Sequence, residues 1–383
     1  MTTKRKRLKV VSLFANIGVA EAYLKDIGVD VVVANEIDPR RAELYKKIYP
    51  DCNMICGNIL NKEVFSDILS CCERAKVDVV LATPPCQGMS TAGQKKEFDE
   101  RNNLVLSAIN VVKAIHPRYV MIENVPEFKI TSIMYKGKAT LLTEVIKNEL
   151  QDDYFIEMKV INTDDYMVPQ TRERIIILMT QKDVHKKWAF PPKASSKVTM
   201  QDAIGNIPPI DPFVKDISEN EFKQLFPNYE KKRSEALKIS KWNEPPVHVL
   251  RQVKVMQYTP SGCSAFDNAP EHRPQKIDGS LVRGYHNTYK RQNWDTPAYT
   301  VTMDNRKISS QNNVHPGRKD GFDKNGVQIY SDARTLTLYE IMKIMSIPDN
   351  WNLPDDTNEA FLRRIIGEGI PPLFVKQVFE KII

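Results

Sequence analysis

Cysteine is scarce in this chain, and its spacing argues against the usual structural uses. Six cysteines occur in 383 residues. They form neither the paired framework of a disulfide-stapled protein nor the two C-x-x-C knuckles of a zinc site. We therefore expect free thiols and a reducing compartment. The cysteines are Cys52, Cys56, Cys71, Cys72, Cys86 and Cys263.

Long apolar runs and internal repeats are also missing. No apolar run reaches the roughly 20 residues that a membrane helix needs. The N-terminal segment superficially resembles a signal peptide, but Asn16 and Gly18 interrupt its apolar part. The basic run 4–7 is most simply a solvated tail, with a targeting or nucleic-acid-binding patch as the alternative. We expect a cytoplasmic protein without a membrane partner.

The sequence does contain enough apolar material for a large core, together with an excess of positive charge. A chain of this length is expected to form two domains, or one domain with a large insertion. Apolar residues make up 42% of it. The net charge is +7, and residues 181–290 alone hold 18 Lys/Arg against 12 Asp/Glu. A basic middle section is typical of a protein with a polyanionic partner.

Short apolar runs alternate with amphipathic stretches from residue 8 to about residue 180. This alternation predicts β-α units around a mostly parallel sheet. The predicted strands are 8–14, 29–36, a short one near 53–57, 77–83, 118–125, and a final pair at 154–162 and 174–180, with a helix over 102–115.

The composition changes after this unit. Residues 191–274 contain 11 of the 24 prolines and few periodic segments, which predicts a loop-rich insert or second domain. Helical patterns return after residue 334 and are expected to pack back on the first unit.

Unusual residues follow the predicted strands at their carboxyl ends, where open α/β sheets bind ligands. Glu36 follows the second strand, at a distance from Gly18 that suits hydrogen bonds to ribose hydroxyls, so we predict a nucleoside-containing cofactor. One glycine does not make a dinucleotide fingerprint, and pyrophosphate binding is therefore the weaker alternative. The residues at the five strand ends are Asn16, Gly18, Glu36, Gly57, Asn58, Pro84, Pro85, Cys86, Glu123 and Asn124.

Cys86 follows two consecutive prolines directly after the fourth predicted strand. Each proline fixes φ and restricts the residue before it, so the backbone that carries the thiol is rigid. A buried small hydrophobe is the alternative role for a lone cysteine. The fixed loop favours a nucleophile instead. Glu123, at the end of the fifth strand, is a candidate acid, and a capping or ion-pair group is its alternative.

With these residues in place, the chain resembles the DNA (cytosine-5)-methyltransferase family over nearly its whole length. The matching segments occur in the family's order, and together they are very specific. They are FANIG (14–18), PPCQ (84–87), ENV (123–125), QTRER (170–174), RQNWDTPAYTVT (291–302), RTLTLYEIMKIMSIPDNW (334–351) and GEGIPP (367–372).

The resemblance implies a doubly wound α/β fold of the S-adenosylmethionine-dependent methyltransferase type, with a smaller loop-rich DNA-recognition domain. Residues 1–183 would form the catalytic and cofactor-binding domain, residues 184–333 the target-recognition domain and hinge, and residues 334–383 the helices that complete the catalytic domain. The implied methyl donor is S-adenosylmethionine, the product is S-adenosylhomocysteine, the partner is double-stranded DNA, and no metal takes part.

The chemistry that the resemblance implies explains the residue types. Cys86 would add to carbon 6 of a cytosine flipped out of the duplex. Glu123 would donate a proton or hydrogen bond to ring nitrogen 3. Arg174 would hold the carbonyl oxygen of the cytosine, and Arg172 would stabilise the loop or the neighbouring charge. Residues 88–99 correspond to the loop that closes over the base, with an ordinary flexible loop as the alternative.

The resemblance also implies binding residues. The expected DNA contacts are Ser90, Arg291 and Thr300. The expected cofactor residues are Phe14, Ala15, Asn16, Ile17, Gly18, Glu36, Ile37, Asn58, Ile59, Pro85, Leu104, Glu368 and Gly369.

The chain departs from the family pattern at five positions. The family usually has Asp, Gly and Gly where Ser12, Asn16 and Val19 stand, Asp where Asn58 stands, and Asn where Glu368 stands. Asn tolerates the left-handed backbone better than most residues, and the Asn58 amide oxygen can still accept a hydrogen bond. Glu368 would either repel the carboxylate of the cofactor or meet its ammonium group. The departures bear on cofactor affinity more than on reaction type.

We therefore predict a monomeric bacterial DNA cytosine-5 methyltransferase that is solitary or belongs to a restriction-modification system, with any cognate endonuclease acting separately. An RNA cytosine methyltransferase is one alternative, although the Cys-Phe-Thr signature of the transfer-RNA branch does not occur in the sequence. A non-catalytic DNA-binding relative is the other, and the joint presence of Cys86, Glu123, Arg172 and Arg174 argues against it. The residues do not reveal which DNA sequence is recognised.

Overall fold

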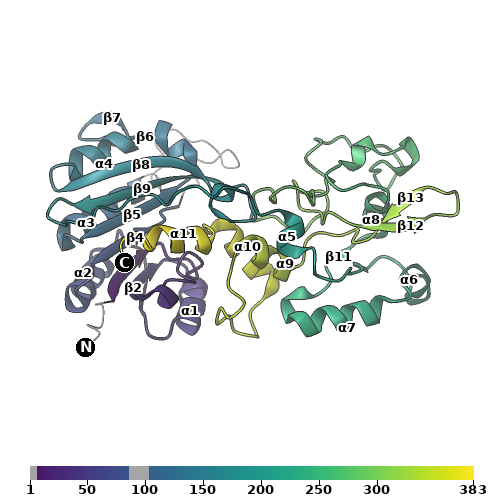
Figure 1. Cartoon of the computed structure of the whole chain (residues 1–383), viewed down its shortest axis with the longest axis horizontal. Coiled ribbons are helices and arrows are strands. Elements are labelled where there is room, and N and C mark those ends of the chain that lie inside the picture. Colours follow the sequence, from purple (N-terminus) through teal and green to yellow (C-terminus); the bar gives the residue numbers. More distant parts are fainter. Residues whose placement is uncertain (1–6, 86–102) are drawn as a thin grey trace.

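The protein has two halves side by side along its longest axis (Figure 1). The computed structural model describes residues 7–85 and 103–383. Residues 7–85, 103–181 and 372–383 are named here the sheet half, and residues 205–333 the insert half. Between the halves lie helices α5 (Met200–Ile204), α9 (Leu338–Ile344) and α10 (Glu359–Glu368).

Some predicted features lie outside the described residues. They are Cys86, Ser90, the predicted loop 88–99 and residues 4–6 of the basic N-terminal run. Among the helices of the described ranges, none is long and apolar enough to cross a membrane.

The main sheet confirms the predicted α/β fold class. Within the described ranges it has seven strands in the order β3-β2-β1-β4-β5-β9-β8. Strands β1 to β5 are parallel, and β9 runs antiparallel to both of its neighbours. The strands are β1 (Leu8–Leu13), β2 (Val29–Glu36), β3 (Asn53–Cys56), β4 (Val79–Ala82), β5 (Tyr119–Asn124), β8 (Tyr154–Asn162) and β9 (Glu173–Gln181).

The central strands are apolar on both faces because helices cover both sides of the sheet. In β5, Val120 and Ile122 pack on one face, while Tyr119 and Met121 pack on the other. Helices α2 (Lys62–Ala75), α3 (Leu104–Ile115) and α4 (Leu142–Leu150) cover the first face. Helix α11 (Pro372–Phe379) covers the second, and α1 (Pro39–Ile48) packs beside β2 and β3.

The helices predicted after residue 334 are present and contact the first loop of the sheet. Ile17 and Val19, which follow β1, share a hydrophobic cluster with Leu338 of α9 and Ile365 of α10. Helix α9 begins with a reciprocal capping box between Thr337 and Glu340. The cluster joins the two halves, and the division at residues 183 and 333 stays a prediction.

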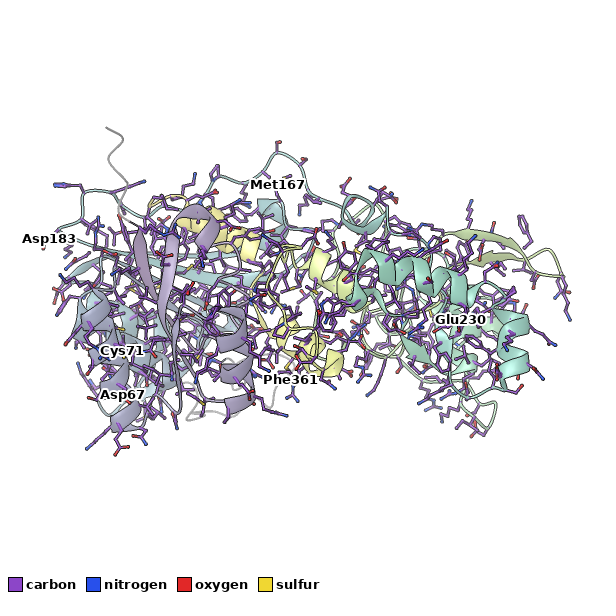
Figure 2. All side chains as sticks on the ribbon, turned by 90° about the horizontal axis from the view of Figure 1, so that it is seen from below. Asp67, Cys71, Met167, Asp183, Glu230 and Phe361 are labelled. Carbon is purple, nitrogen blue, oxygen red and sulfur yellow. The ribbon has the colours of Figure 1, made fainter. Side chains whose placement is uncertain are left out.

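The insert half has more helix than the sequence pattern predicts. Helix α7 (Tyr229–Ile239) was missed because it buries only Tyr229 and Ala236 and therefore lacks a broad apolar stripe. Figure 2 shows Glu230 on this helix, Cys71 in the sheet half, and Phe361 between the two. The other elements are α6 (Glu219–Leu225), α8 (Leu250–Gln257), the strand pairs β10 (Phe213–Val214) with β11 (Val247–His248) and β12 (Lys319–Phe322) with β13 (Gln328–Tyr330), and, in the sheet half, the hairpin β6 (Ser132–Tyr135) and β7 (Lys138–Leu141).

Candidate functional site

The loop after β1 has an unusual backbone that neighbouring side chains hold in place. Phe14, Asn16 and Gly18 have φ values of 60°, 53° and 81°, in the left-handed region. The backbone N–H of Asn16 donates to Glu36 Oε2 at 2.9 Å. A Cβ atom on Gly18 would lie 2.2 Å from a ring carbon of Tyr49, so only glycine fits. The predicted turn at 16–18 is thus tied to the end of β2.

A buried carboxyl group lies beneath this loop. The Tyr45 hydroxyl donates to Glu21, and Ser12 also hydrogen-bonds to it. Burial raises the pKa of Glu21 to about 7, although these hydrogen bonds oppose the rise. The protonated form of Glu21 is therefore favoured to a higher pH than that of an ordinary carboxyl group.

The ends of β2 and β3 present polar and apolar groups to the same edge. Glu36 also accepts from the backbone N–H of Asp38 at 2.9 Å. Asn35, which the sequence reasoning missed, donates to the carbonyl oxygens of Ile55 and Gly57 at 2.9 and 3.0 Å. Its position next to Glu36 at a strand end was the available signal.

Two apolar side chains stand exposed after these strands. Ile37 and Leu60 are each 61% exposed. The amide oxygen of Asn58 accepts from the Leu60 N–H at 3.0 Å and so shapes this turn. Exposed apolar groups beside the Glu36 carboxylate suit a ligand with a flat aromatic part and hydroxyl groups.

The neighbouring strands β5 and β9 bring the predicted acid and one predicted arginine together. Arg174 Nε lies 2.8 Å from Glu123 Oε1, and both side chains are largely buried. The Asn124 side chain donates to the Pro84 carbonyl at 3.1 Å. The Thr83 hydroxyl donates to the Phe14 carbonyl at 3.1 Å. The proline pair that precedes Cys86 is thereby fastened to both neighbouring strand ends.

Arg172, the other predicted arginine, holds backbone groups of two segments that are distant in sequence. Its guanidinium is buried and donates to the carbonyl oxygens of Val301, Gly367 and Glu368 at 3.0 to 3.1 Å. Gly367 permits this approach, because a Cβ there would lie 2.5 Å from the Thr302 carbonyl oxygen. Arg172 therefore positions the segment after residue 300 and the end of α10 against the sheet.

Several predicted cofactor residues contribute backbone or packing rather than an open side chain. Ile17 and Ile59 are buried in hydrophobic clusters, so their side chains face the core. Leu104, the first residue of α3, is partly buried in the same core as Ile59. Gly369 packs against Val19, with 3.1 Å from its Cβ position to that side chain. The remaining predicted residues Ala15 and Pro85 lie on the loops after β1 and β4.

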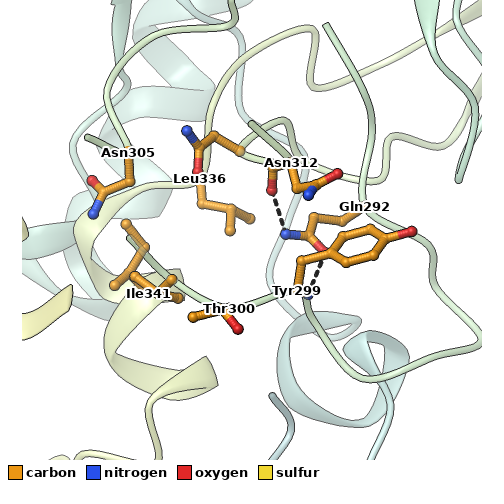
Figure 3. A pocket seen from close by; sticks show the side chains of 9 residues that line it. Gln292, Tyr299, Thr300, Asn305, Asn312, Leu336 and Ile341 are labelled. Atoms are coloured by element: carbon orange, nitrogen blue, oxygen red, sulfur yellow. Dashed lines mark hydrogen bonds between the residues drawn. The ribbon is translucent and has the colours of Figure 1, made fainter. Parts of the chain in front are cut away.

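Thr300 lies where the segment after residue 291 crosses the sheet half. It is exposed, and its hydroxyl donates to the Thr171 carbonyl at 2.7 Å. Figure 3 shows the small cavity beside it, of about 10 Å³, which Gln292, Leu336 and Ile341 also line. A cavity of this size holds at most one water. It is a packing feature, and a DNA contact from Thr300 stays a prediction.

The expected DNA contact from Arg291 needs correction. Arg291 is fully buried, and its guanidinium donates to four carbonyl oxygens, those of Met256, His315, Ser331 and Asp332, at 2.8 to 3.0 Å. A buried guanidinium already directed at backbone oxygens cannot reach a phosphate. We therefore reassign Arg291 to a structural role within the insert half.

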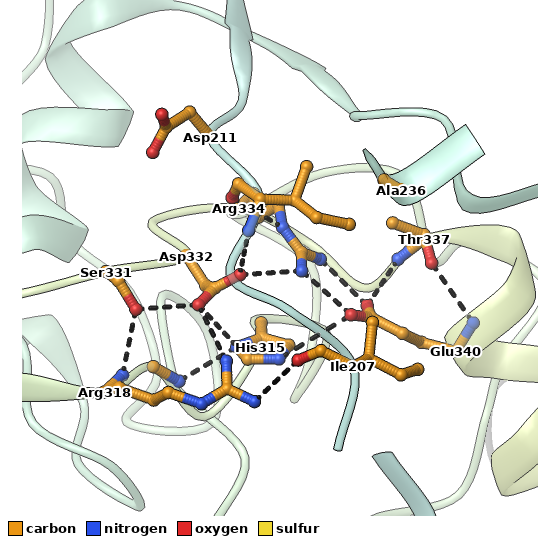
Figure 4. A network of polar contacts seen from close by, with 12 residues as sticks. Ile207, Asp211, Ala236, His315, Arg318, Ser331, Asp332, Arg334, Thr337 and Glu340 are labelled. Atoms are coloured by element: carbon orange, nitrogen blue, oxygen red, sulfur yellow. Dashed lines mark hydrogen bonds and ion pairs between the residues drawn. The ribbon is translucent and has the colours of Figure 1, made fainter. Parts of the chain in front are cut away.

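A buried network of charged residues connects the insert half to α9 (Figure 4). Arg334 pairs with both oxygens of Glu340 at 2.8 Å and with Asp332 at 2.8 Å. Burial by itself would lower the pKa of Arg334, but Glu340 and Asp332 raise it above the usual value. The backbone N–H of Ile210 donates to the Asp332 carboxylate, and the Arg334 guanidinium donates to the Ile210 carbonyl oxygen. The network thus fixes the entry and exit of the insert half.

Two buried histidines adjoin this network and are held neutral. His315 Nδ1 accepts from the Gly317 N–H at 3.0 Å, and His248 Nε2 accepts from the Thr335 N–H at 3.1 Å. Burial lowers the pKa of His248 to about 3 and that of His315 to about 4. Both rings are therefore uncharged acceptors at neutral pH.

Within residues 7–85 and 103–383, no group of three or more His, Cys, Asp or Glu side chains is arranged to hold a metal ion. The prediction that no metal takes part stays a prediction.

Comparison with known proteins places this geometry in context. The family model described as C-5 cytosine-specific DNA methylase matches residues 8–383. Type II methyltransferase M1.HgaI of Avibacterium volantium is 38% identical over 385 residues, which cover 99% of each chain. Type II methyltransferase M1.HphI of Haemophilus parahaemolyticus is 26% identical and covers 98% of this chain and 87% of the relative.

The fold also matches solved structures. A crystal structure described as a DNA modification methyltransferase encoded within an E. coli prophage aligns with a TM-score of 0.65 over 98% of each chain. Its sequence identity is 20%, so this likeness shows the fold alone.

Proposed function

The chain belongs to the family of C-5 cytosine-specific DNA methylases, and on that premise we propose that Cys86, Glu123 and Arg174 carry out cytosine methylation in duplex DNA. The family uses S-adenosylmethionine as its methyl donor. The observation that carries the proposal is the Glu123–Arg174 pair, at 2.8 Å, beside the proline segment that leads into Cys86.

Cys86 is proposed as the nucleophile. Carbon 5 of cytosine is a poor nucleophile, and addition of a thiolate at carbon 6 converts the ring to an enamine that can attack a methyl group. Loss of the proton from carbon 5 then permits elimination of the Cys86 thiolate, which restores the aromatic ring. Asn124 donates to the Pro84 carbonyl and Thr83 donates to the Phe14 carbonyl, and both hydrogen bonds support this role because they orient the backbone that leads to the thiol.

Glu123 and Arg174 are proposed to handle the charge that develops on the ring. Glu123 would act at ring nitrogen 3, which becomes more basic when the thiolate adds. Arg174 uses Nε for Glu123 and Nη1 for the Glu173 carbonyl. A guanidinium has five N–H donors, so donors remain for the carbonyl oxygen of the cytosine. Arg172 is proposed as a positioning residue, because its guanidinium donates to the carbonyl oxygens of Val301, Gly367 and Glu368.

The methyl donor is proposed to bind at the ends of β1, β2 and β3. When bound, S-adenosylmethionine supplies an electrophilic methyl group on its sulfonium. The Glu36 oxygens each hold one backbone N–H and keep a second lone pair for ribose hydroxyls. Exposed Ile37 and Leu60 fit an adenine ring. The Phe14–Gly18 loop would lie against the remainder of the donor.

The relatives named Type II methyltransferases support a restriction-modification context. We propose that the protein acts as a cytoplasmic monomer on duplex DNA, without a metal, and that any cognate endonuclease acts separately. The insert half would read the DNA sequence, and Thr300 would contact the DNA at its border with the sheet half. The other predicted DNA contact, Ser90, lies outside the described residues.

The test starts in cells, because the target sequence has first to be identified. Bisulfite sequencing of DNA from cells that express the protein identifies the methylated cytosine. A duplex with 5-fluorocytosine at that position, supplied with S-adenosylmethionine, should then trap the protein covalently. A denaturing gel and peptide mass spectrometry locate the attachment, which we expect at Cys86.

The controls separate chemistry from folding. Cys263→Ser, a change in the insert half, should still be trapped, whereas Cys86→Ser should bind S-adenosylhomocysteine but form no adduct. Glu123→Gln should reduce the methylation rate by about 100-fold or more. Methylation of transfer RNA in preference to duplex DNA, or adduct formation by Cys86→Ser, would refute the proposal.

A further inference from the structure

A charged cluster joins the loop after β1 to α1 and α10, which are far apart in sequence and adjacent in space (Figure 1). Arg41 Nη1 and Nη2 lie 2.7 and 3.1 Å from the two carboxylate oxygens of Glu368. Asn16 donates its side-chain N–H to Glu368 at 3.4 Å and to the Ile365 carbonyl at 3.2 Å. A bidentate pair of this kind fixes orientation as well as charge.

The cluster retains hydrogen-bonding capacity beyond these contacts. The Arg41 and Glu368 side chains are 21% and 23% exposed. Each Nη of Arg41 carries a second N–H, and Oε1 of Glu368 keeps a lone pair, whereas Oε2 already accepts from both Arg41 and Asn16. Asn16 Oδ1 is buried and has no hydrogen-bond partner among the described residues. A buried acceptor without a partner is costly, and a donor from a ligand would relieve that cost.

The arrangement places a cation and an anion side by side at the edge of the loop. Arg41 lies in the first turn of α1, where the helix dipole adds positive potential. Glu368 supplies the negative charge, and Arg41 neutralises it in part. A ligand that carries both an ammonium and a carboxylate on one carbon atom complements such a pair, whereas a simple anion would be repelled by Glu368.

We propose that Arg41 and Glu368, with Asn16, recognise the zwitterionic aminocarboxylate end of the methyl donor, and that Arg41 is the residue that positions Glu368 for this task. The inference rests on the proposed function. It explains how a glutamate can stand at position 368 beside a ligand that has its own carboxylate, because Arg41 offsets the repulsion.

The test compares two ligands that differ only in this end. S-adenosylhomocysteine carries the aminocarboxylate, and 5′-methylthioadenosine lacks it. By calorimetry, Arg41→Ala and Glu368→Gln should each weaken S-adenosylhomocysteine binding by about 10- to 100-fold, which is the usual effect of losing a charge-assisted hydrogen bond. Binding of 5′-methylthioadenosine should change less than about twofold. The methylation KM for the donor should rise more than kcat falls.

Matched variants keep the outcome interpretable. Arg40→Ala removes the neighbouring arginine, whose side chain is 78% exposed, and should change neither affinity. Arg41→Lys should recover part of the loss, and the Arg41→Ala/Glu368→Gln double variant should lose less than the product of the single effects because the two residues act as a pair. Thermal unfolding of each unliganded variant reports whether it is folded.

Two results would overturn the inference. Equal weakening of both ligands would mean that the substitutions damage the loop in general, and no weakening of either would mean that the pair does not touch the ligand. Failure of the proposed function is a different result, because the unaltered protein would then bind neither S-adenosylhomocysteine nor S-adenosylmethionine and would methylate no DNA.

Discussion

The sheet half and the insert half present their functional segments on different kinds of support. In the sheet half, loops extend from strands whose side chains are apolar on both faces, and short hydrogen bonds at the strand ends hold them. In the insert half, regular structure is sparse, and buried Arg291 and Arg334 bind backbone carbonyls and carboxylates at its base.

The difference fits the tasks that are proposed for the two halves. Chemistry needs atoms held within a fraction of an ångström, which rigid strand ends provide. The insert half, which is proposed to read DNA, buries a smaller apolar cluster that includes Phe222 and Met256, and much of its remaining chain forms long loops. A buried ionic network can fix their ends because its bonds are directional, although it contributes less net stability than apolar packing would.

The largest effect is expected from removing Arg334, which lies at the centre of the buried network with Asp332 and Glu340. Arg334→Met leaves Asp332 and Glu340 buried without their cation, so we expect a loss of about 3–5 kcal/mol in the free energy of unfolding. Urea unfolding followed by circular dichroism measures it. Arg233→Met is the matched control, because the Arg233–Glu244 pair is about 40% exposed and should matter by less than about 1 kcal/mol. Equal losses would remove the distinction between the network and an ordinary surface pair.

A second test addresses the loop of the sheet half. Gly18→Ala places a methyl group 2.2 Å from the Tyr49 ring at a left-handed φ, so we expect a loss of about 2–4 kcal/mol and weaker binding of S-adenosylhomocysteine. Gly28→Ala is the control, because its φ of 82° is nearly the same but nothing lies within 4 Å of the added Cβ. It should cost about 1 kcal/mol. If thermal unfolding shows that Gly18→Ala and Gly28→Ala lose the same free energy of unfolding, crowding against Tyr49 is not the cause of the loss in Gly18→Ala.

A buried group in each half should also make the free energy of unfolding depend on pH, in opposite directions. These are the smallest expected effects, roughly 2–3 kcal/mol each. The pKa of Glu21 is raised to about 7 by burial, so its contribution is present below pH 4.5 and is lost as the pH rises through 7. The pKa of His248 is lowered to about 3 by burial, so its contribution is present above pH 6.5 and is lost as the pH falls toward 3.

Unfolding free energies at pH 5 and pH 8 separate these contributions. Relative to the unaltered protein, Glu21→Gln should gain stability on going from pH 5 to pH 8, and His248→Gln should lose it. The same sign for both variants would contradict the assignment of Glu21 and His248 to opposite responses.

The sequence predicted the sheet well because apolar alternation and turn residues are local signals. The strand predicted at 29–36 has those bounds in the structure, and the strand predicted at 154–162 does as well. Helix α7 was missed because a mostly charged helix has no local apolar stripe. The prediction for Arg291 was wrong because basic residues near a predicted DNA surface look alike in sequence, whether they face a phosphate or a buried carbonyl.

The sequence names the side chains proposed to react, and their catalytic roles stay predictions, but it does not reveal the residues that hold them in position. Glu123 and Arg174 were identified from short motifs, and the structure places them 2.8 Å apart. The Arg41–Glu368 pair joins residues that no motif connects, and Asn35 and the tie from Asn124 to Pro84 depend on which strands are neighbours.

The sequence alone determined the family and the α/β fold class, because each depends on local pattern or on motifs in a given order. Only the tertiary structure decided which charges are neutralised. That depends on distance and burial, and residues such as Arg41 and Glu368 become partners only after the C-terminal helices return to the sheet.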